Sequence, residues 1–274
     1  MPKKHIIHAT KSLALELNML KQQGFDCDTP TMSKKGDISW IWRELHGSRN
    51  WEGLLEPLNP LLRREIVKYG EFAQATYDSF DFDSYSKYCG SNRYKKEELF
   101  DKLHLTRHGY KVTRYIYAMS DIDLPRWLER SLVDSPWSRE SNWIGFVAVS
   151  TDDESKRLGR RDIVVAWRGT VAPSEWIQDL NAKLKPLGQG NIKVEKGFLS
   201  IYTTRSGSCK YNKKSASQQV MKELKKLVSL YKEKGEEVSL TITGHSLGGA
   251  LALLNAHEAA TTLTKDVTFL VLSQ

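Results

Sequence analysis

Residues 240–254 read LTITGHSLGGALALL and contain the pattern that decides the fold. An alternating apolar run from Val238 to Ile242 predicts a buried strand, and an alanine- and leucine-rich helical pattern follows at once. Between them, residues 244–248 form the G-x-S-x-G pattern of a nucleophile elbow in its strand–turn–helix context. The sharp turn would expose the Ser246 hydroxyl, and the flanking glycines would let the neighbouring backbone pass close by. We therefore predict that Ser246 is a catalytic nucleophile.

The alternative for the same stretch is an ordinary glycine-rich turn between a strand and a helix. Both flanks and the additional glycine at Gly249 favour the nucleophile. The start of the following helix would also point backbone N–H groups and a positive dipole end at the reacting centre.

Length and composition describe a globular protein with one large α/β domain or two small ones. The chain has 274 residues, a hydrophobic content of 40% and a mean hydropathy of −0.49, which allow an ample core. The net charge of +8 suits an anionic partner, either nucleic acid or an acidic lipid surface. No nucleic-acid-reading motif accompanies this charge, so we expect no nucleic acid partner; a solvated basic surface remains open.

Cysteine usage and the N-terminal composition suggest a compartment. Cys27, Cys89 and Cys209 are far apart and form no C-x-x-C pair, which favours a reducing environment. No apolar run reaches the roughly 18 residues of a membrane span. The N-terminus resembles neither a signal peptide nor a transit peptide. We therefore expect a cytoplasmic protein.

The pattern of the remaining chain predicts an α/β fold. Asn59-Pro60 is a helix start, and apolar residues recur at helical spacing to about residue 79. The clearest helix covers 215–234, and a short helix is expected over 95–103. Strands are expected at 110–118, 143–149, 162–167 and 267–272, with the charged segment 151–161 as the turn of an antiparallel hairpin. The aromatic-rich residues 38–55 are expected to be buried in a helical cap.

Four motifs in order carry a family resemblance. RGT at 168–170 with WIQDL at 176–180, VEKGF at 194–198 and GHSLGG at 244–249 resemble the class 3 (fungal-type) lipases. The stretches 50–80, 110–120 and 159–170 are similar to one branch, the plant phospholipase A1 enzymes of the cytosolic type. The resemblance implies an α/β-hydrolase with a mixed, mostly parallel sheet and flanking helices. It divides the chain into a peripheral extension (1–36), a helical cap region (37–109) and a partial lipase core (110–274).

The resemblance also implies roles for individual residues. Ser246 matches the acyl-accepting nucleophile. Thr170, through its backbone N–H and side chain, and Leu247, through its backbone N–H, match the oxyanion hole. Residues 172–179 match the lid, in which Trp176 and Ile177 would meet lipid; a core position remains the alternative for Trp176. No cofactor and no metal are expected.

The chain departs from the family pattern where the base and its acid are expected. After Ser246 only His257, Glu258 and Asp266 are candidates. His257 lies eleven positions further along the same helix, roughly 16 Å from Ser246 and too far for a hydrogen bond. Glu258, one position further on, is too far away for the same reason. His245 is expected to be a structural residue turned inward. We therefore expect that the triad aspartate and histidine are absent from residues 1–274.

That absence suggests a truncated product, with 267–272 as an apolar edge and turnover far below that of an extended chain. The first functional hypothesis is an acylhydrolase that cleaves the sn-1 ester of phospholipids as a peripheral protein at the membrane surface. A galactolipid or triacylglycerol lipase is the alternative among enzymes, and an impaired lipid-surface binder is the alternative outside them. The basic residues Arg205, Lys210, Lys213 and Lys214 are expected to favour anionic vesicles. The oligomeric state stays open.

Overall fold

A five-stranded sheet forms the centre of the computed structural model, which describes residues 36–83, 85–119, 141–170, 184–187, 192–263 and 267–273. The strands lie in the order β1 (Tyr110–Ala118), β2 (Asn142–Ser150), β3 (Arg161–Trp167), β6 (Val238–Gly244) and β7 (Thr268–Ser273). The pairs β1–β2 and β2–β3 are antiparallel, whereas β3–β6 and β6–β7 are parallel. All strands of this sheet except β2 therefore run in one direction, and the predicted mixed, mostly parallel sheet is confirmed.

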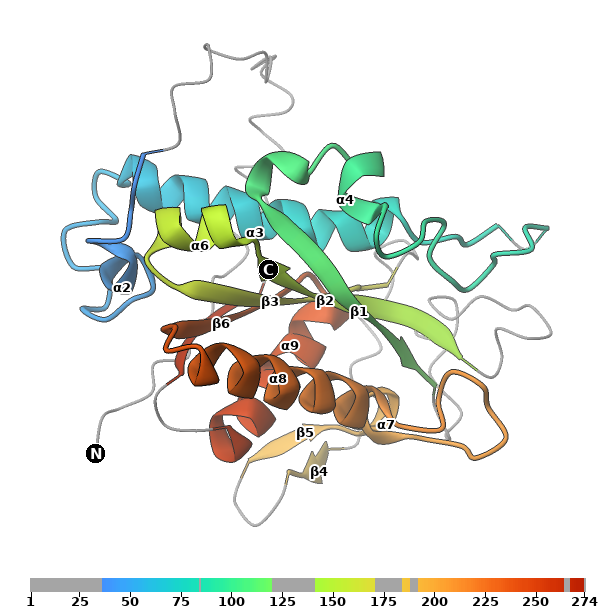
Figure 1. Cartoon of the computed structure of the whole chain (residues 1–274). Coiled ribbons are helices and arrows are strands. Elements are labelled where there is room, and N and C mark those ends of the chain that lie inside the picture. Colours follow the sequence, from blue (N-terminus) through green and yellow to red (C-terminus); the bar gives the residue numbers. More distant parts are fainter. Residues whose placement is uncertain are drawn as a thin grey trace.

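Helices cover both faces of this sheet (Figure 1). One face carries α2 (Trp42–Leu45), α3 (Pro60–Asp78), α4 (Leu99–Lys102), the 3₁₀ turn η1 (Thr106–His108) and α6 (Asp152–Leu158). The other carries α7 (Lys196–Thr203), α8 (Ala216–Glu233) and α9 (Leu247–Thr262), next to a two-stranded ribbon of β4 (Leu184–Pro186) and β5 (Lys193–Glu195). None of the helices in the described ranges is long and apolar enough to cross a bilayer.

Side-chain alternation explains the central position of β3 and β6. On β3, Val165 faces the core under α8 and α9, while Val164 faces the core under α3. On β6, Ile242 faces α8 and α9, and the intervening Ser239 and Thr241 turn their hydroxyls toward α3. The two strands that carry the candidate site are thus buried on both faces.

The two long helices begin where the sequence predicts. Asn59 Oδ1 accepts a hydrogen bond from the backbone N–H of Leu61 at 2.8 Å, and Pro60 occupies the first helical position of α3. Ser215 and Gln218 form a reciprocal capping box at the start of α8. Both helix starts are confirmed.

Other local predictions are wrong. The segment 151–161 connects β2 to β3, which pair antiparallel as expected. The segment contains helix α6 instead of a simple turn. Thr151 caps this helix, acidic side chains fill its first turn, and Gly159 ends it in a left-handed conformation (φ 70°). The expected helix over 95–103 has only the four residues of α4.

The aromatic-rich segment 38–55 is only partly buried. Trp42 and Leu45 in α2 are buried, whereas Trp40 is 73% exposed and Leu55 is also exposed. Strand β7 is the edge of the described sheet, and its central residues Leu270 and Val271 are buried by the helices on the two faces.

Candidate active site

The G-x-S-x-G stretch forms a strained turn between β6 and α9. Ser246 has φ 59° and ψ −124°, a conformation that a non-glycine residue rarely adopts, and its side chain is partly exposed. A Cβ on Gly244 would lie 2.3 Å from the carbonyl oxygen of Gly248, and a Cβ on Gly248 would lie 2.3 Å from that of Trp167. The two glycines are therefore required for the close approach of the turn to itself and to the end of β3.

Thr170 lies just beyond the end of β3, next to this turn. Strand β3 pairs with β6, with Trp167 opposite Gly244, so the residues after both strands meet at one end of the sheet. Thr170 is only 8% exposed, and its Oγ1 has no hydrogen-bond partner within the described residues. An unpaired buried hydroxyl costs free energy, and a substrate oxygen at this position would satisfy it.

Leu247 is the first residue of α9, and its backbone N–H has no acceptor within the helix. The Gly248 N–H donates to the His245 carbonyl oxygen at 2.9 Å, which leaves the Leu247 N–H at the helix end beside Ser246. This position suits the second oxyanion donor that the sequence predicts.

Arg168 holds the peptide group that carries the Thr170 N–H. Its guanidinium is fully buried and donates through Nη1 to the carbonyl oxygen of Gly169 at 3.0 Å and through Nε to that of Trp143 at 3.0 Å. Burial lowers the pKa of Arg168 to about 9, so the group stays cationic at neutral pH. The Gly169 C=O and the Thr170 N–H belong to one trans peptide group and point in opposite directions. The hydrogen bond from Arg168 to the Gly169 carbonyl oxygen therefore orients the Thr170 N–H and polarises it.

Tyr77, at the end of α3, connects this peptide to the elbow. Its hydroxyl lies 3.0 Å from Nδ1 of His245 and donates to the His245 carbonyl oxygen at 3.2 Å. A Cβ on Gly169 would lie 1.9 Å from the same hydroxyl. Burial raises the pKa of Tyr77 to about 12, so the phenol is neutral.

His245 is exposed, so the expectation that it turns inward is wrong. Its ring contacts Tyr77, whose hydroxyl lies 3.0 Å from Nδ1. The helical spacing of apolar residues predicts that Tyr77 lies on the inner side of its helix. No signal in the sequence predicts the contact of Tyr77 with His245.

The described residues bring no acid–base pair to Ser246. Glu258 on α9 instead accepts hydrogen bonds from Tyr202 at 2.6 Å and Ser217 at 2.8 Å, in agreement with its expected distance from the site. His108 pairs with Glu71 on the α3 side of the molecule. The other proposed residues, Trp176, Ile177 and Asp266, lie outside the described residues.

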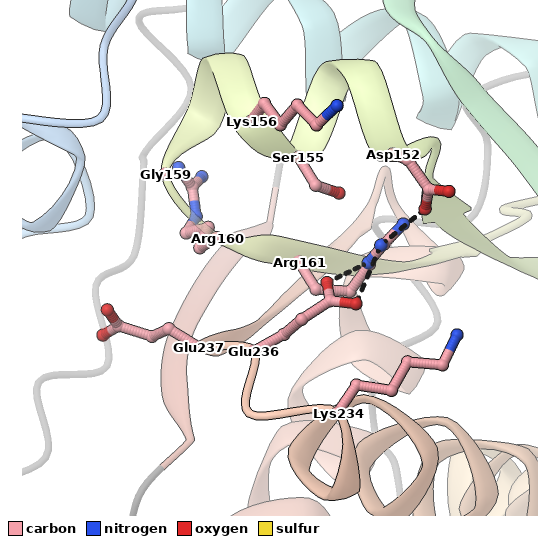
Figure 2. Close-up of a pocket in the computed structure, with 9 residues that line it drawn as sticks. All are labelled: Asp152, Ser155, Lys156, Gly159, Arg160, Arg161, Lys234, Glu236 and Glu237. Carbon is pink, nitrogen blue, oxygen red and sulfur yellow. Dashed lines mark hydrogen bonds and ion pairs between the residues drawn. The ribbon is translucent and has the colours of Figure 1, made fainter.

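A polar cleft of about 480 Å³ lies at the opposite end of β3 and β6 (Figure 2). Its central side chain, Arg161, donates to Glu236 and Asp152 at 2.7 Å and to the carbonyl oxygen of Ser150 at 2.6 Å. Because these bonds occupy most of the guanidinium, the cleft has the character of a structural ion-pair network. Within the described ranges, no three His, Cys, Asp or Glu side chains gather as a metal site would require.

Comparison with known proteins covers the residues of the candidate site. Residues 164–272, which contain Thr170 and Ser246, match the family model "Lipase (class 3)". These residues are therefore similar to the class 3 lipases. The predicted resemblance is therefore confirmed for the region that forms the candidate site.

Several plant proteins extend the similarity to about four-fifths of the chain. Phospholipase A1-Igamma3 of Arabidopsis thaliana is 53% identical over 80% of this chain and 43% of its own length. Phospholipase A1-II 6 of Oryza sativa is 47% identical over 79% of this chain and 54% of its own length. The chain thus spans about half the length of these relatives. A solved structure of Rhizomucor miehei triacylglyceride lipase aligns with 79% of this chain and 62% of its own at 18% identity and a TM-score of 0.41.

The names of the relatives correct the expected compartment. Phospholipases A1-Igamma3, A1-Igamma1 and A1-Igamma2, at 53%, 51% and 48% identity, are all named chloroplastic. The cytoplasmic expectation, and with it the cytosolic type, is therefore wrong. Separated cysteines indicate a reducing compartment but do not say which one.

Proposed function

We propose that this chain carries the serine site of an acylhydrolase that cleaves the sn-1 ester of phospholipids. The observation that supports it most is the strained Ser246 turn beside a buried Thr170 hydroxyl that has no partner among the described residues. The substrate class follows the names of the relatives, which are phospholipases A1 at up to 53% identity.

In the proposed reaction, the Ser246 oxygen attacks the ester carbonyl carbon and transfers its proton to a general base. The carbonyl oxygen becomes an oxyanion that accepts hydrogen bonds from the N–H groups of Leu247 and Thr170 and from the Thr170 hydroxyl. Each preorganised donor of this kind contributes about 3–4 kcal/mol to the transition state. Arg168 adds a fixed positive charge behind the Thr170 peptide.

Collapse of the tetrahedral intermediate breaks the ester bond and releases the lysophospholipid, which takes the proton from the base. Water then attacks the acyl-Ser246 ester and releases the fatty acid, which restores the serine. We propose that the base and its orienting acid lie outside the described residues, because these provide no histidine–carboxylate pair at Ser246.

We further propose that the protein acts as a peripheral protein on phospholipid membranes in the plastid, without a nucleic acid partner. The compartment follows the chloroplastic names of three relatives. The membrane surface follows the net charge of +8 and the four exposed cations Arg205, Lys210, Lys213 and Lys214, which lie in a segment with no acidic residue.

The test is fatty acid release from separate preparations of phosphatidylcholine, galactolipid and triacylglycerol, with Ser246→Ala as the control. We expect preferential release from the sn-1 position of phosphatidylcholine and none from the Ser246→Ala variant. Preference for galactolipid or triacylglycerol would reassign the substrate. Release that persists in the variant would overturn the serine mechanism.

A further inference from the structure

The loop between α3 and α4 displays three large aromatic side chains to solvent. Phe82 is 57% exposed, Tyr85 97% and Tyr88 49%. Figure 1 shows the loop projecting beyond the end of α3. We call these three residues the aromatic loop. Large exposed apolar patches mark interaction sites, and these three side chains come from a single loop.

The described residues of this loop, on both sides of position 84, are joined by hydrogen bonds. Asp81 donates its N–H to the carbonyl oxygen of Ser91 at 2.9 Å, and Gly90 donates its N–H to that of Asp81 at 2.8 Å. The Ser86 hydroxyl donates to the Asp81 carboxylate at 2.6 Å. These bonds hold the described residues at the base of the loop, so that burial of the aromatic side chains against a partner costs less entropy than for a free chain.

The aromatic loop lies at the same end of the sheet as Ser246. Phe80, two positions before Phe82, packs its ring 3.7 Å from the guanidinium carbon of Arg168, the residue that holds the Thr170 peptide. The carbonyl oxygen of Gly90 accepts a hydrogen bond from the Trp143 N–H at 2.8 Å. The base of the loop thus contacts the motif that forms the candidate oxyanion hole.

A basic segment adjoins this surface. The exposed cations Arg205, Lys210, Lys213 and Lys214, here called the basic loop, occupy residues 205–214, which contain no acidic side chain. Tyr117 joins the two loops. Its hydroxyl lies 3.3 Å from the Ser91 hydroxyl, and its ring stacks on that of Tyr211 at 4.6 Å.

We propose that the aromatic loop and the basic loop together form a docking surface for an anionic lipid–water interface, with Ser246 facing the bilayer. The chemistry favours lipid: tyrosine and phenylalanine rings enter the headgroup region, while lysine and arginine neutralise lipid phosphates. The biological role of this surface rests on the proposed lipid hydrolysis, but binding can be measured without it.

The test is binding of the full chain, carrying Ser246→Ala so that no lipid is consumed, to vesicles of phosphatidylcholine mixed with phosphatidylglycerol. We expect the Phe82→Ser/Tyr85→Ser variant to bind the vesicles at least about ten-fold more weakly than the parent chain. Lys213→Ser/Lys214→Ser should also weaken binding, by about five-fold for each lysine, and should reduce its salt dependence. Trp40→Ser is the matched control, because Trp40 is 73% exposed and lies beside α6 at the other end of the sheet.

Unchanged vesicle binding by Phe82→Ser/Tyr85→Ser, with circular dichroism confirming that it is folded, would overturn the proposal. An equal loss in Trp40→Ser would also overturn it. Sedimentation velocity separates lipid from a second copy: a dimer that the aromatic variant dissociates, with unchanged vesicle binding, would assign the surface to self-association instead. Hydrolysis that persists in Ser246→Ala refutes only the proposed function and leaves the binding result to stand.

Discussion

The two ends of strands β3 and β6 contrast in how their polar groups are satisfied. At the amino end, the buried Asp162 carboxylate accepts hydrogen bonds from Tyr69 at 2.9 Å, Tyr110 at 2.7 Å and Ser239 at 2.7 Å. At the carboxyl end, Ser246 is strained and Thr170 keeps a buried hydroxyl without a partner among the described residues.

The difference separates stability from chemistry along the same pair of strands. The hydrogen bonds that converge on the buried Asp162 carboxylate make one arrangement of the amino end rigid and specific, whereas backbone strain at Ser246 is kept where a substrate binds. Substitutions at the amino end should therefore change the free energy of unfolding, and those at the carboxyl end should change reactivity.

Asp162→Asn should give the largest effect on stability. The substitution leaves Tyr69, Tyr110 and Ser239 around an uncharged amide that cannot accept all their hydrogen bonds. We expect a loss of about 3–5 kcal/mol in the free energy of unfolding, measured by urea denaturation. A loss below about 1 kcal/mol would show that the amino end is not a stabilising network.

Thr170→Val should lower activity and leave stability intact, the reverse of Asp162→Asn. It keeps the shape of the side chain and removes a hydroxyl that has no partner among the described residues, so we expect unchanged or slightly increased stability. The kcat/KM for ester hydrolysis should fall by about 10²-fold, because one oxyanion donor is lost. Thr113→Val, in a half-buried part of β1, is the control that should leave kcat/KM unchanged.

Much of the carboxyl end could be predicted from sequence, because its motifs are local. RGT and GHSLGG place Thr170 and Ser246 directly after two strands, and parallel pairing brings such positions together. The contact of Tyr77 with His245 spans 168 positions and depends on the packing of α3 across the sheet, which no local pattern encodes.

The amino end was harder to predict, for a related reason. In DIVVAW the apolar residues dominate, so Asp162 reads as the polar start of a strand. Its partners come from α3, β1 and β6, and they meet only after the sheet has formed. A buried carboxylate with several hydroxyl donors is therefore visible only in the structure.

Tyr77→Phe should have an intermediate effect at the carboxyl end. Without the hydroxyl, the turn at His245 and the peptide at Gly169 lose a shared contact. We expect about a ten-fold lower kcat with KM unchanged within about two-fold, because ground-state binding is not affected. Tyr115→Phe removes a comparable hydrogen bond, to the carbonyl oxygen of Tyr94 at 3.0 Å, and should leave kcat unchanged. Equal losses in both variants would exclude a positioning role for Tyr77.

The smallest effect is a pH dependence at the amino end. His46 is buried beside Arg160 and Lys68, and desolvation followed by these charges holds the pKa of His46 well below its ordinary value of 6.5. Its other neighbours are the rings of Trp42 and Tyr69. Below about pH 6.5 the unfolded chain binds a proton that the folded chain does not, so stability falls as pH falls, by up to about 1.4 kcal/mol per pH unit.

Urea denaturation from pH 7.5 to pH 5.5 measures this slope, and His46→Gln should flatten it. The range lies above the window in which Glu65 and other carboxyls with lowered pKa values lose their stabilising charge. An unchanged slope in His46→Gln would assign the pH dependence to other groups.

The most direct test of the central claim is covalent labelling of the folded chain with a fluorophosphonate, followed by peptide mass spectrometry. The strained turn and preformed donors should make Ser246 the labelled residue, at a rate about 10³-fold above that of a serine in a free peptide. Thr170→Val should slow this labelling, whereas Thr113→Val should not. Labelling of another residue, or of Ser246 no faster than the free peptide, would contradict the assignment of the carboxyl end as a catalytic site.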